Sequence, residues 1–301
     1  SQHSLAAVAD PDEFTAQVEL QRATVTELFG APTSFRNTEL ILDNTICRRV
    51  EGLGFDCMLG EGADRVLGWR SPQVPYRAKG CDRLTLLLRS YSLSDDIAFR
   101  FSNREWPGHP LFADTYAGWL HDVPAPAQCI GLFMDYETFG EHQQDHTGIL
   151  EFMRHLPSHV LEDPGFRFRT PAQVAAAREA ITELDVDRPT SWADEDRGLS
   201  AWLGNPMQLA AHEKLYGMRD DVLRAAARRP ELLAAWRELT TSDHVYYVAT
   251  QHHSDAEVHE YFSPYDSPHA AFVTLMTALD DLEKQVRRGL ETPARARRGE
   301  K

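Results

Sequence analysis

The sequence contains little lysine and no excess of positive charge. Lysine occurs only at positions 79, 214, 284 and 301, and the formal net charge at pH 7 is −15. Nucleic acids and anionic membranes are bound through Lys and Arg against phosphate groups, so this balance argues against both as partners. A neutral, hydroxyl-rich ligand or a cationic ligand fits the composition better.

Cysteine is also scarce, and its spacing is not that of a redox or zinc motif. The four cysteines, at positions 47, 57, 81 and 129, form no CxxC pair and lie in otherwise apolar segments. We therefore expect buried, reduced thiols rather than disulfides or a zinc site, and a reducing, cytoplasmic compartment. The sequence also lacks any run of about 18 to 20 apolar residues, the length that a membrane span needs.

The first part of the chain alternates short apolar segments with helical patterns. This alternation is typical of a parallel sheet with helical crossovers. The chain has 301 residues, of which 42% are hydrophobic, so it is long enough for one large domain or two smaller ones. We expect strands at 34–41, 55–59, 83–88, 129–134 and 166–170, and helices at 12–29, 44–52, from Thr147 to Pro157 and from Pro171.

After about residue 185 the strand patterns fade and helical patterns dominate. Helices are expected at 206–218, 230–239 and 268–288. The sequence thus predicts an α/β part at 1–185 and a helical subdomain at 186–290 that contributes to a substrate cleft. The charged tail at 291–301 is expected to be frayed.

Acidic residues follow three of the expected strands. Glu39 and Glu61 come at the ends of the first two, and the stretch GLFMDYETFG places Asp135 and Glu137 after the fourth. Because strand side chains alternate, these last two acids are expected on one side of the chain and Tyr136 on the other. A single acid in such a position is usually a solvated or capping group. Several that converge in one cleft suit glycoside hydrolysis, in which one carboxylate attacks the sugar and another protonates the leaving oxygen.

Aromatic residues provide surfaces on which sugar rings stack. Trp69 in GWRSP and Trp202 in LSAWLGNPMQ carry flat apolar faces with a polar edge. The same holds for the tryptophans at positions 106, 119, 192 and 236, although about half of the six are expected in the core. The same segments and SDHVYY contain side chains that bond to hydroxyls, namely Arg70, Asn205, Gln208 and Asp243.

Two histidine clusters raise the alternative of a metal site. The run HQQDH places His142 and His146 four residues apart with Asp145 beside the second, as in some zinc-binding helices. The segment is expected to be a loop, however, and its spacing suggests no third ligand. A second cluster, at 252–259, is more often polar surface or substrate contact.

The motifs together resemble α-amylase-like members of glycoside hydrolase family 57. FRNTELI, EGADRVLGWRSP, SLSDDIAFRFS, FMDYETFGEHQ, LSAWLGNPMQ, SDHVYY and YFSPYDSP occur in that family in this order, and the resemblance covers about residues 3 to 283. It implies a seven-stranded (β/α)7 barrel with a C-terminal helical region. It also implies action on α-1,4-linked glucans or maltooligosaccharides with retention of configuration, and no catalytic metal or other cofactor.

The resemblance also assigns roles to particular residues. The match of FRNTELI to the nucleophile motif makes Glu39 the expected nucleophile. The match of MDYETFGEH to the acid/base motif, which in many members reads closer to DAELFGHWW, makes Asp135 the expected general acid/base, with Glu137 and His142 in support. Family members begin with a strand that carries a His-Gln-Pro motif, which this sequence lacks. We therefore expect an incomplete barrel without its first strands, and a chain that is a poor enzyme alone.

Other functions stay open at this point. The same family contains glucanotransferases and branching enzymes, which use the same intermediate but a sugar acceptor. A metal-dependent carbohydrate deacetylase would use Asp135, His142 and His146 as ligands. A non-catalytic glucan-binding protein is the third possibility. The oligomeric state is left undecided by the sequence.

Overall fold

The computed structural model describes residues 3–250 and 263–291, and these form two compact units. One is continuous, Val25–Trp192, and contains the sheet. The other combines two stretches that are distant in sequence, residues 3–24 and the described residues from Ala193 onward. The sequence predicts a division of the chain near residue 185, and the two units divide at Trp192 and Ala193. Residues 3–24, which were expected in the α/β part, group with the C-terminal helices instead. The expected tail and the histidines at 252–259 lie outside the described residues.

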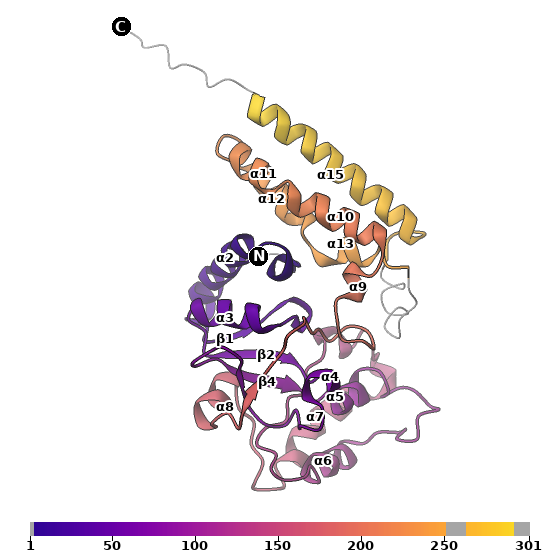
Figure 1. Ribbon diagram of the computed structural model, residues 1–301. Helices are drawn as coiled ribbons and strands as arrows, with labels where there is room; N and C mark the ends of the chain where they lie inside the picture. The colour runs from indigo at the N-terminus through magenta and orange to yellow at the C-terminus, as the bar shows by residue number, and fades with distance from the viewer. Residues whose placement is uncertain (1–2, 251–262, 292–301) are drawn as a thin grey trace. The chain divides into compact units, whose positions relative to one another are not determined.

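The continuous unit has an α/β fold built on a mixed, five-stranded sheet (Figure 1). The strand order is β1-β2-β4-β3-β5. The β1–β2, β2–β4 and β3–β5 pairs are parallel, and β3 is antiparallel to β4. The sheet is open, so the α/β class is confirmed but a barrel is not. The strands are β1 Ser34–Arg36, β2 Cys57–Glu61, β3 Tyr76–Ala78, β4 Thr85–Arg89 and β5 Glu183–Leu184.

Three of the five expected strands are present in some form. The segment at 34–41 contains β1, and the segments at 55–59 and 83–88 overlap β2 and β4, which end one or two residues later than expected. The segment at 129–134 is extended but makes one isolated parallel bridge, between Gly131 and Arg89, and is therefore not a full strand. The expected strand at 166–170 is wrong, because its Phe and Arg residues are mostly exposed and pair with no neighbouring strand. β3 and β5, with three and two residues, are too short for a periodic signal.

The helices of this unit begin and end as local chemistry dictates. Asp43 caps α3 by accepting hydrogen bonds from the backbone N–H groups of Thr45 and Ile46. α7 begins after Gly148, whose φ of 85° is left-handed, and continues through Pro157, so the expected cap at Thr147 and stop at Pro157 are wrong. The unit also contains the end of α2 Pro11–Phe29, from Val25 onward. Its other helices are α3 Asn44–Gly52, α4 Asp64–Leu67, α5 Tyr91–Ala98, α6 Ala113–His121, α7 Ile149–Val160 and α8 Pro171–Ala177.

The other unit is helical. Trp236 is fully buried in it, donates its indole N–H to the carbonyl of Leu215 at 2.8 Å, and packs edge-on against Tyr216. The longest helix, α15 Pro268–Glu291, packs against α10, α11 and α12 (Figure 1). The remaining helices are α1 Ala6–Ala9, α2 as far as Thr24, α9 Ser200–Leu203, α10 Pro206–Gly217, α11 Arg219–Ala226, α12 Glu231–Leu239 and α13 Ser242–Tyr246.

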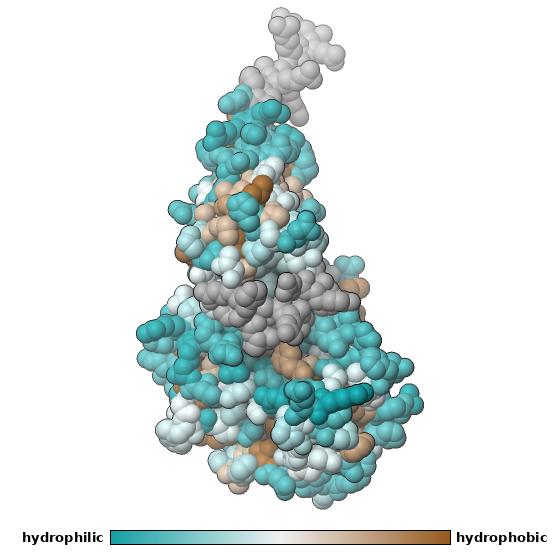
Figure 2. Space-filling model, turned by 90° about the vertical axis from the view of Figure 1, so that its right-hand side faces the viewer, coloured by the Kyte–Doolittle hydropathy of each residue, from teal (hydrophilic) through white to brown (hydrophobic). Residues whose placement is uncertain are grey.

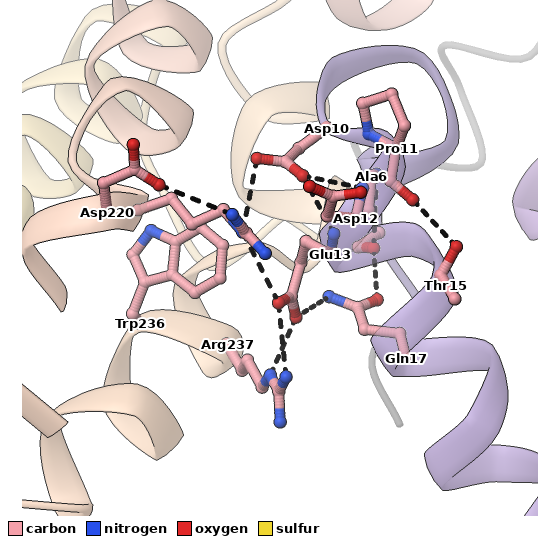
Figure 3. Close-up of polar contacts among 12 residues, drawn as sticks. Ala6, Asp10, Pro11, Asp12, Glu13, Thr15, Gln17, Asp220, Trp236 and Arg237 are labelled. Atoms are coloured by element: carbon pink, nitrogen blue, oxygen red, sulfur yellow. Dashed lines mark hydrogen bonds and ion pairs between the residues drawn. The ribbon is translucent and has the colours of Figure 1, made fainter. Parts of the chain in front are cut away.

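A buried cluster of charges joins the two stretches of the helical unit (Figure 3). Glu13 on α2 is 0% exposed and accepts two hydrogen bonds from Arg237 on α12, at 2.7 and 3.2 Å. Gln17 donates a third to the same carboxylate at 3.0 Å. Arg219 lies 3.3 Å from a carboxylate oxygen of Asp10, which also caps the start of α2. Residues 3–24 are therefore fixed to the C-terminal helices by charged groups inside the unit.

The face drawn in Figure 2 is dominated by polar residues, and its hydrophobic residues are scattered rather than gathered into one broad patch. Within residues 3–250 and 263–291, no helix combines the length and the apolar character that a membrane span requires.

Candidate active site

Glu39 occupies a strained turn directly after β1. It lies in the 3₁₀ turn η1 Thr38–Leu40, with φ 53° and ψ 26°, and Leu40 follows with φ 54°. Two successive left-handed residues that are not glycine are uncommon and cost free energy, and such strain concentrates at functional sites. The turn directs Glu39 away from the strand path that the sequence predicts for residues 34–41.

Trp192 bonds to both the side chain and the backbone of Glu39. Its indole N–H donates to Glu39 Oε2 at 2.5 Å, and its backbone N–H donates to the Glu39 carbonyl at 3.1 Å. The segment that carries Trp192 runs antiparallel to the chain after Glu39, with reciprocal backbone bonds between Leu42 and Thr190 at 3.1 and 2.9 Å. The Arg36 guanidinium lies 4.5 Å from the centre of the Trp192 ring, within cation–π range. The carboxylate of Glu39 is thus held in one orientation.

Arg89 at the carboxyl end of β4 forms a second polar centre. Its side chain is 5% exposed and donates to Glu61 Oε2 at 3.2 Å and to Asp95 Oδ1 at 2.5 Å. Glu61 lies opposite Arg89 in the register of β2 and β4, and its side chain is fully buried. Arg89 Nε donates to the carbonyl of Phe133 at 2.7 Å, and its guanidinium lies 5.8 Å from the centre of the Trp192 ring.

Asp135 follows two residues after Phe133 and opens the 3₁₀ turn η2 Tyr136–Thr138. The turn closes on itself, since His142 N donates to the Glu137 carbonyl at 3.0 Å and Gln143 N donates to the Thr138 carbonyl at 3.0 Å. Asp135 and Glu137 are exposed, and Tyr136 between them is 93% exposed. The expected alternation of these three residues along a strand is wrong, because the chain leaves its extended path at Asp135.

These groups lie at one edge of the sheet. Glu39 follows β1, Glu61 ends β2 and Arg89 ends β4, and these three strands are parallel. Direct contacts run from Glu39 through Trp192 and Arg89 to Phe133, which leads into Asp135. The structure therefore places Glu39 after the parallel strand β1, and Asp135 after the segment that bridges to β4, at the edge of the sheet where α/β proteins carry out chemistry.

Trp69 and Arg70 follow α4 in the same unit but differ in environment. Trp69 is 95% exposed and presents its ring to solvent. Arg70 donates to the carbonyls of Val66 and Leu67 at 2.6 and 3.0 Å, which closes the end of α4. Trp69 is therefore accessible to a ligand, whereas the guanidinium of Arg70 has a structural role.

The remaining expected substrate contacts lie in the helical unit. Trp202 is 2% exposed and packs edge-on against Tyr246. Asn205 and Gln208 form a reciprocal capping box at the start of α10, and both are buried. Gln208 also donates to the carbonyls of Ala201 and Val245, and Asp243 is half-buried in α13. These polar groups hold helix ends together, and a substrate role for them stays a prediction.

The metal alternative gains no support from the geometry. Among the residues that the structure describes, no three His, Cys, Asp or Glu side chains form a group able to hold a metal ion. Asp135, His142 and His146 are thus not assembled as a ligand set. Cys47, Cys57, Cys81 and Cys129 are free, as expected.

Two residues of this region were not singled out from the sequence. Trp192 was expected only as one of several stacking aromatics, and Arg89 not at all. A signal for Arg89 exists, since an arginine that ends the apolar run LTLLL of a buried strand needs buried acidic partners. No comparable signal links Trp192 to Glu39, because 153 residues separate them.

Glycoside hydrolysis uses two carboxylates, and this α/β unit carries Glu39 and Asp135 at one edge of its sheet. The sequence profile of glycosyl hydrolase family 57 matches residues 2–186, and the chain belongs to this family. A protein of Methanocaldococcus jannaschii named "Putative alpha-amylase" is 39% identical over 295 residues, which are 95% of this chain and 62% of that protein. The chain thus spans about three fifths of the length of this relative.

A solved structure shows the same fold. The 4-alpha-glucanotransferase from Thermococcus litoralis is similar with a TM-score of 0.63 and 12% sequence identity. The match covers 81% of this chain and 42% of that chain.

Proposed function

We propose that this chain carries the catalytic carboxylates of a retaining, α-amylase-like hydrolase that acts on α-1,4-linked glucans. The observation that supports it best is the Glu39 carboxylate, held by the Trp192 indole in a strained turn at the carboxyl edge of the sheet. Membership of glycosyl hydrolase family 57 and the similarity to a relative named as an alpha-amylase agree with this proposal.

The proposed mechanism has two steps. Glu39 attacks the anomeric carbon while Asp135 gives its proton to the glycosidic oxygen, so the bond to the leaving sugar breaks and a glycosyl ester forms on Glu39. Asp135, now ionised, then takes a proton from water, which attacks the same carbon and releases Glu39. The exposure of Asp135 suits a group that meets both the leaving sugar and water, and the indole N–H suits the ionised nucleophile.

The other parts of the site have supporting roles in the proposal. Trp69 offers an exposed ring for stacking on a sugar, and Glu137 and His142 shape the turn that carries Asp135. We infer that the open sheet is one arc of a (β/α)7 barrel. The four free cysteines favour a reducing, cytoplasmic compartment. In a glucanotransferase or branching enzyme, a sugar hydroxyl would replace water in the second step.

Azide rescue in the full-length protein tests the two assignments separately. Glu39→Ala should lose turnover of an activated α-maltosyl substrate, and azide should restore it with a β-glycosyl azide as product, because azide then attacks the sugar directly. Asp135→Ala should instead yield the α-glycosyl azide, since its glycosyl-enzyme still forms. Glu105→Gln, an exposed acid of the same unit, is the matched control.

The products of the wild-type protein decide between the wider alternatives. Release of α-configured sugars from maltooligosaccharides, resistant to EDTA, supports the hydrolase, whereas longer oligosaccharides indicate a transferase. Activity that EDTA abolishes and Zn²⁺ restores would favour the deacetylase. Binding of maltooligosaccharides without any product would favour the non-catalytic reading.

A further inference from the structure

Arg89 contacts the Phe133 carbonyl, two residues before Asp135, and lies beside the Trp192 ring, whose indole bonds to Glu39. We propose that Arg89 is a positioning residue that fixes the segment carrying Asp135 relative to Glu39. This inference rests on the proposed function, because it assigns Arg89 a part in that reaction. Arg89 itself is buried and does not reach substrate.

The first step of the argument concerns Asp135. The segment before it is extended but held by few bonds: Gly131 accepts from Ser90 N at 2.8 Å, and Phe133 N donates to Ser94 Oγ at 3.2 Å. The bond from Arg89 Nε to the Phe133 carbonyl, at 2.7 Å, is the last of these before the chain turns at Asp135. A segment with one ladder bridge depends on such side-chain bonds for its position.

The second step concerns Glu39. The Arg89 guanidinium lies 5.8 Å from the Trp192 ring centre, and the Trp192 indole donates to the Glu39 carboxylate. A cation at this distance from a desolvated ring is attracted to it. One side chain therefore contacts the group that orients Glu39 and the carbonyl that precedes Asp135.

The third step is the orientation of Arg89 itself. Glu61 and Asp95 accept from different nitrogens of the guanidinium, at 3.2 and 2.5 Å, and leave Nε directed at Phe133. The planar fork of arginine satisfies three acceptors in fixed directions, which the single ammonium of lysine does not. The fully buried Glu61 thus orients Arg89 in this proposal rather than binding sugar.

The experiment compares Arg89→Lys with Arg100→Lys in the full-length protein. Lysine keeps the charge that Glu61 and Asp95 require but lacks the Nε that bonds Phe133. Arg100 is the matched control, since it pairs with the buried Asp96 and lysine keeps the charge of this pair too. Each variant is assayed on maltooligosaccharides, whose leaving sugar needs protonation, and on α-maltosyl fluoride, whose fluoride departs with little help from an acid.

Displacement of Asp135 slows formation of the glycosyl-enzyme only from the substrate whose leaving group needs the acid, and kcat/KM reports this step, whereas kcat also includes the shared attack of water. Arg89→Lys should lower kcat/KM on maltooligosaccharides about 100-fold and on α-maltosyl fluoride by less than about 10-fold, as expected for a misplacement near 1 Å. Arg100→Lys should match wild type on both. Equal losses of Arg89→Lys on the two substrates, or no loss, would overturn the positioning role.

A second variant keeps the test decisive if Arg89→Lys fails to fold. Ser94→Ala removes the bond from Phe133 N to Ser94 Oγ, together with the bond from Ser94 Oγ to the Ser90 carbonyl, and should show the same dependence on the leaving group, with a smaller effect. Equal effects on both substrates would again count against the proposal. A wild-type protein inactive on both substrates would refute the proposed function itself, whereas an active wild type with unselective variants refutes only the role of Arg89.

Discussion

Arg237 donates both of its hydrogen bonds to Glu13 from a position 224 residues away in the sequence, and the carboxylate that receives them is wholly buried. Gln17 donates to the same carboxylate (Figure 3), and Arg219 Nε lies 4.0 Å from Glu13 Oε2. A buried ion pair adds little net stability when intact, because both charges lose their hydration. Removal of one partner has a large effect, since it leaves the other charge buried and uncompensated.

Arg237→Met should therefore lower the free energy of unfolding by about 3 to 5 kcal/mol. Arg229→Met is the control, because Arg229 pairs with Glu231 at the surface and such pairs contribute about 0 to 1 kcal/mol. Urea denaturation followed by circular dichroism measures both. Similar losses in the two variants would show that the Glu13 carboxylate is not buried as described.

Trp192→Phe should reduce kcat/KM on maltooligosaccharides by about 10- to 100-fold. The variant keeps an aromatic ring beside Arg36 but removes the N–H that donates to Glu39. A hydrogen bond to a charged group contributes about 1.5 to 3 kcal/mol, and each 1.36 kcal/mol corresponds to a factor of ten. Trp106→Phe, outside the site, should leave the rate unchanged, and steady-state kinetics of both variants would reveal any failure of this expectation.

The helical unit should lose stability as the pH falls below about 6.5. Burial lowers the pKa of His212 from its ordinary value of 6.5, and its Nε2 has no hydrogen-bond partner in the described part of the chain. The unfolded state then binds more protons than the folded state, so the stabilisation is complete above pH 6.5 and decreases as the pH falls toward the folded pKa.

His212→Leu cannot titrate, so its melting temperature should decline less than that of wild type between about pH 7.5 and 5.5. His155→Gln, at an exposed position of α7, is the control and should follow wild type. Identical pH slopes for His212→Leu and wild type would contradict the burial argument.

The four thiols should react slowly with Ellman's reagent in the native protein at about pH 8. Burial raises the pKa of Cys57 to about 12 and those of Cys81 and Cys129 to about 11, and it raises the pKa of Cys47 strongly as well. The thiolate is the reactive form, so little of it is present at this pH. All four should react at once in denaturant, and rapid labelling of any of them in the native state would count against this environment.

The helices could be predicted from the sequence because their signals are local. The pattern at 206–218 corresponds to α10, where Pro206 follows a capping asparagine, and the pattern at 44–52 corresponds to α3. The strand at 129–134 was predicted from its apolar composition alone, but a strand also needs a partner along its length, and only Gly131 has one. Phe166 to Thr170 shows the same limit more severely. Pairing is a property of distant segments, which composition does not report.

In the candidate site too, local signals could be read from the sequence, whereas contacts between distant residues could not. Glu39, Glu61 and Asp135 stand out because acids after apolar strands are visible in the sequence. The left-handed turn at Glu39 and its bond to Trp192 depend on contacts across 153 residues, which no local pattern encodes. Asn205 and Gln208 show the opposite error, since polar side chains that suit hydroxyl groups also suit helix ends.

The helical unit is assembled from stretches that leave the ribosome far apart in time. Glu13 and Arg237 are 224 positions apart, which at about 5 to 20 residues per second corresponds to roughly 10 to 45 s of synthesis. During this interval residues 25–192 are synthesised first, and the buried face of residues 3–24 has no partner until the C-terminal helices follow. Phe14 and the other buried side chains of this stretch therefore stay uncovered until α12 appears.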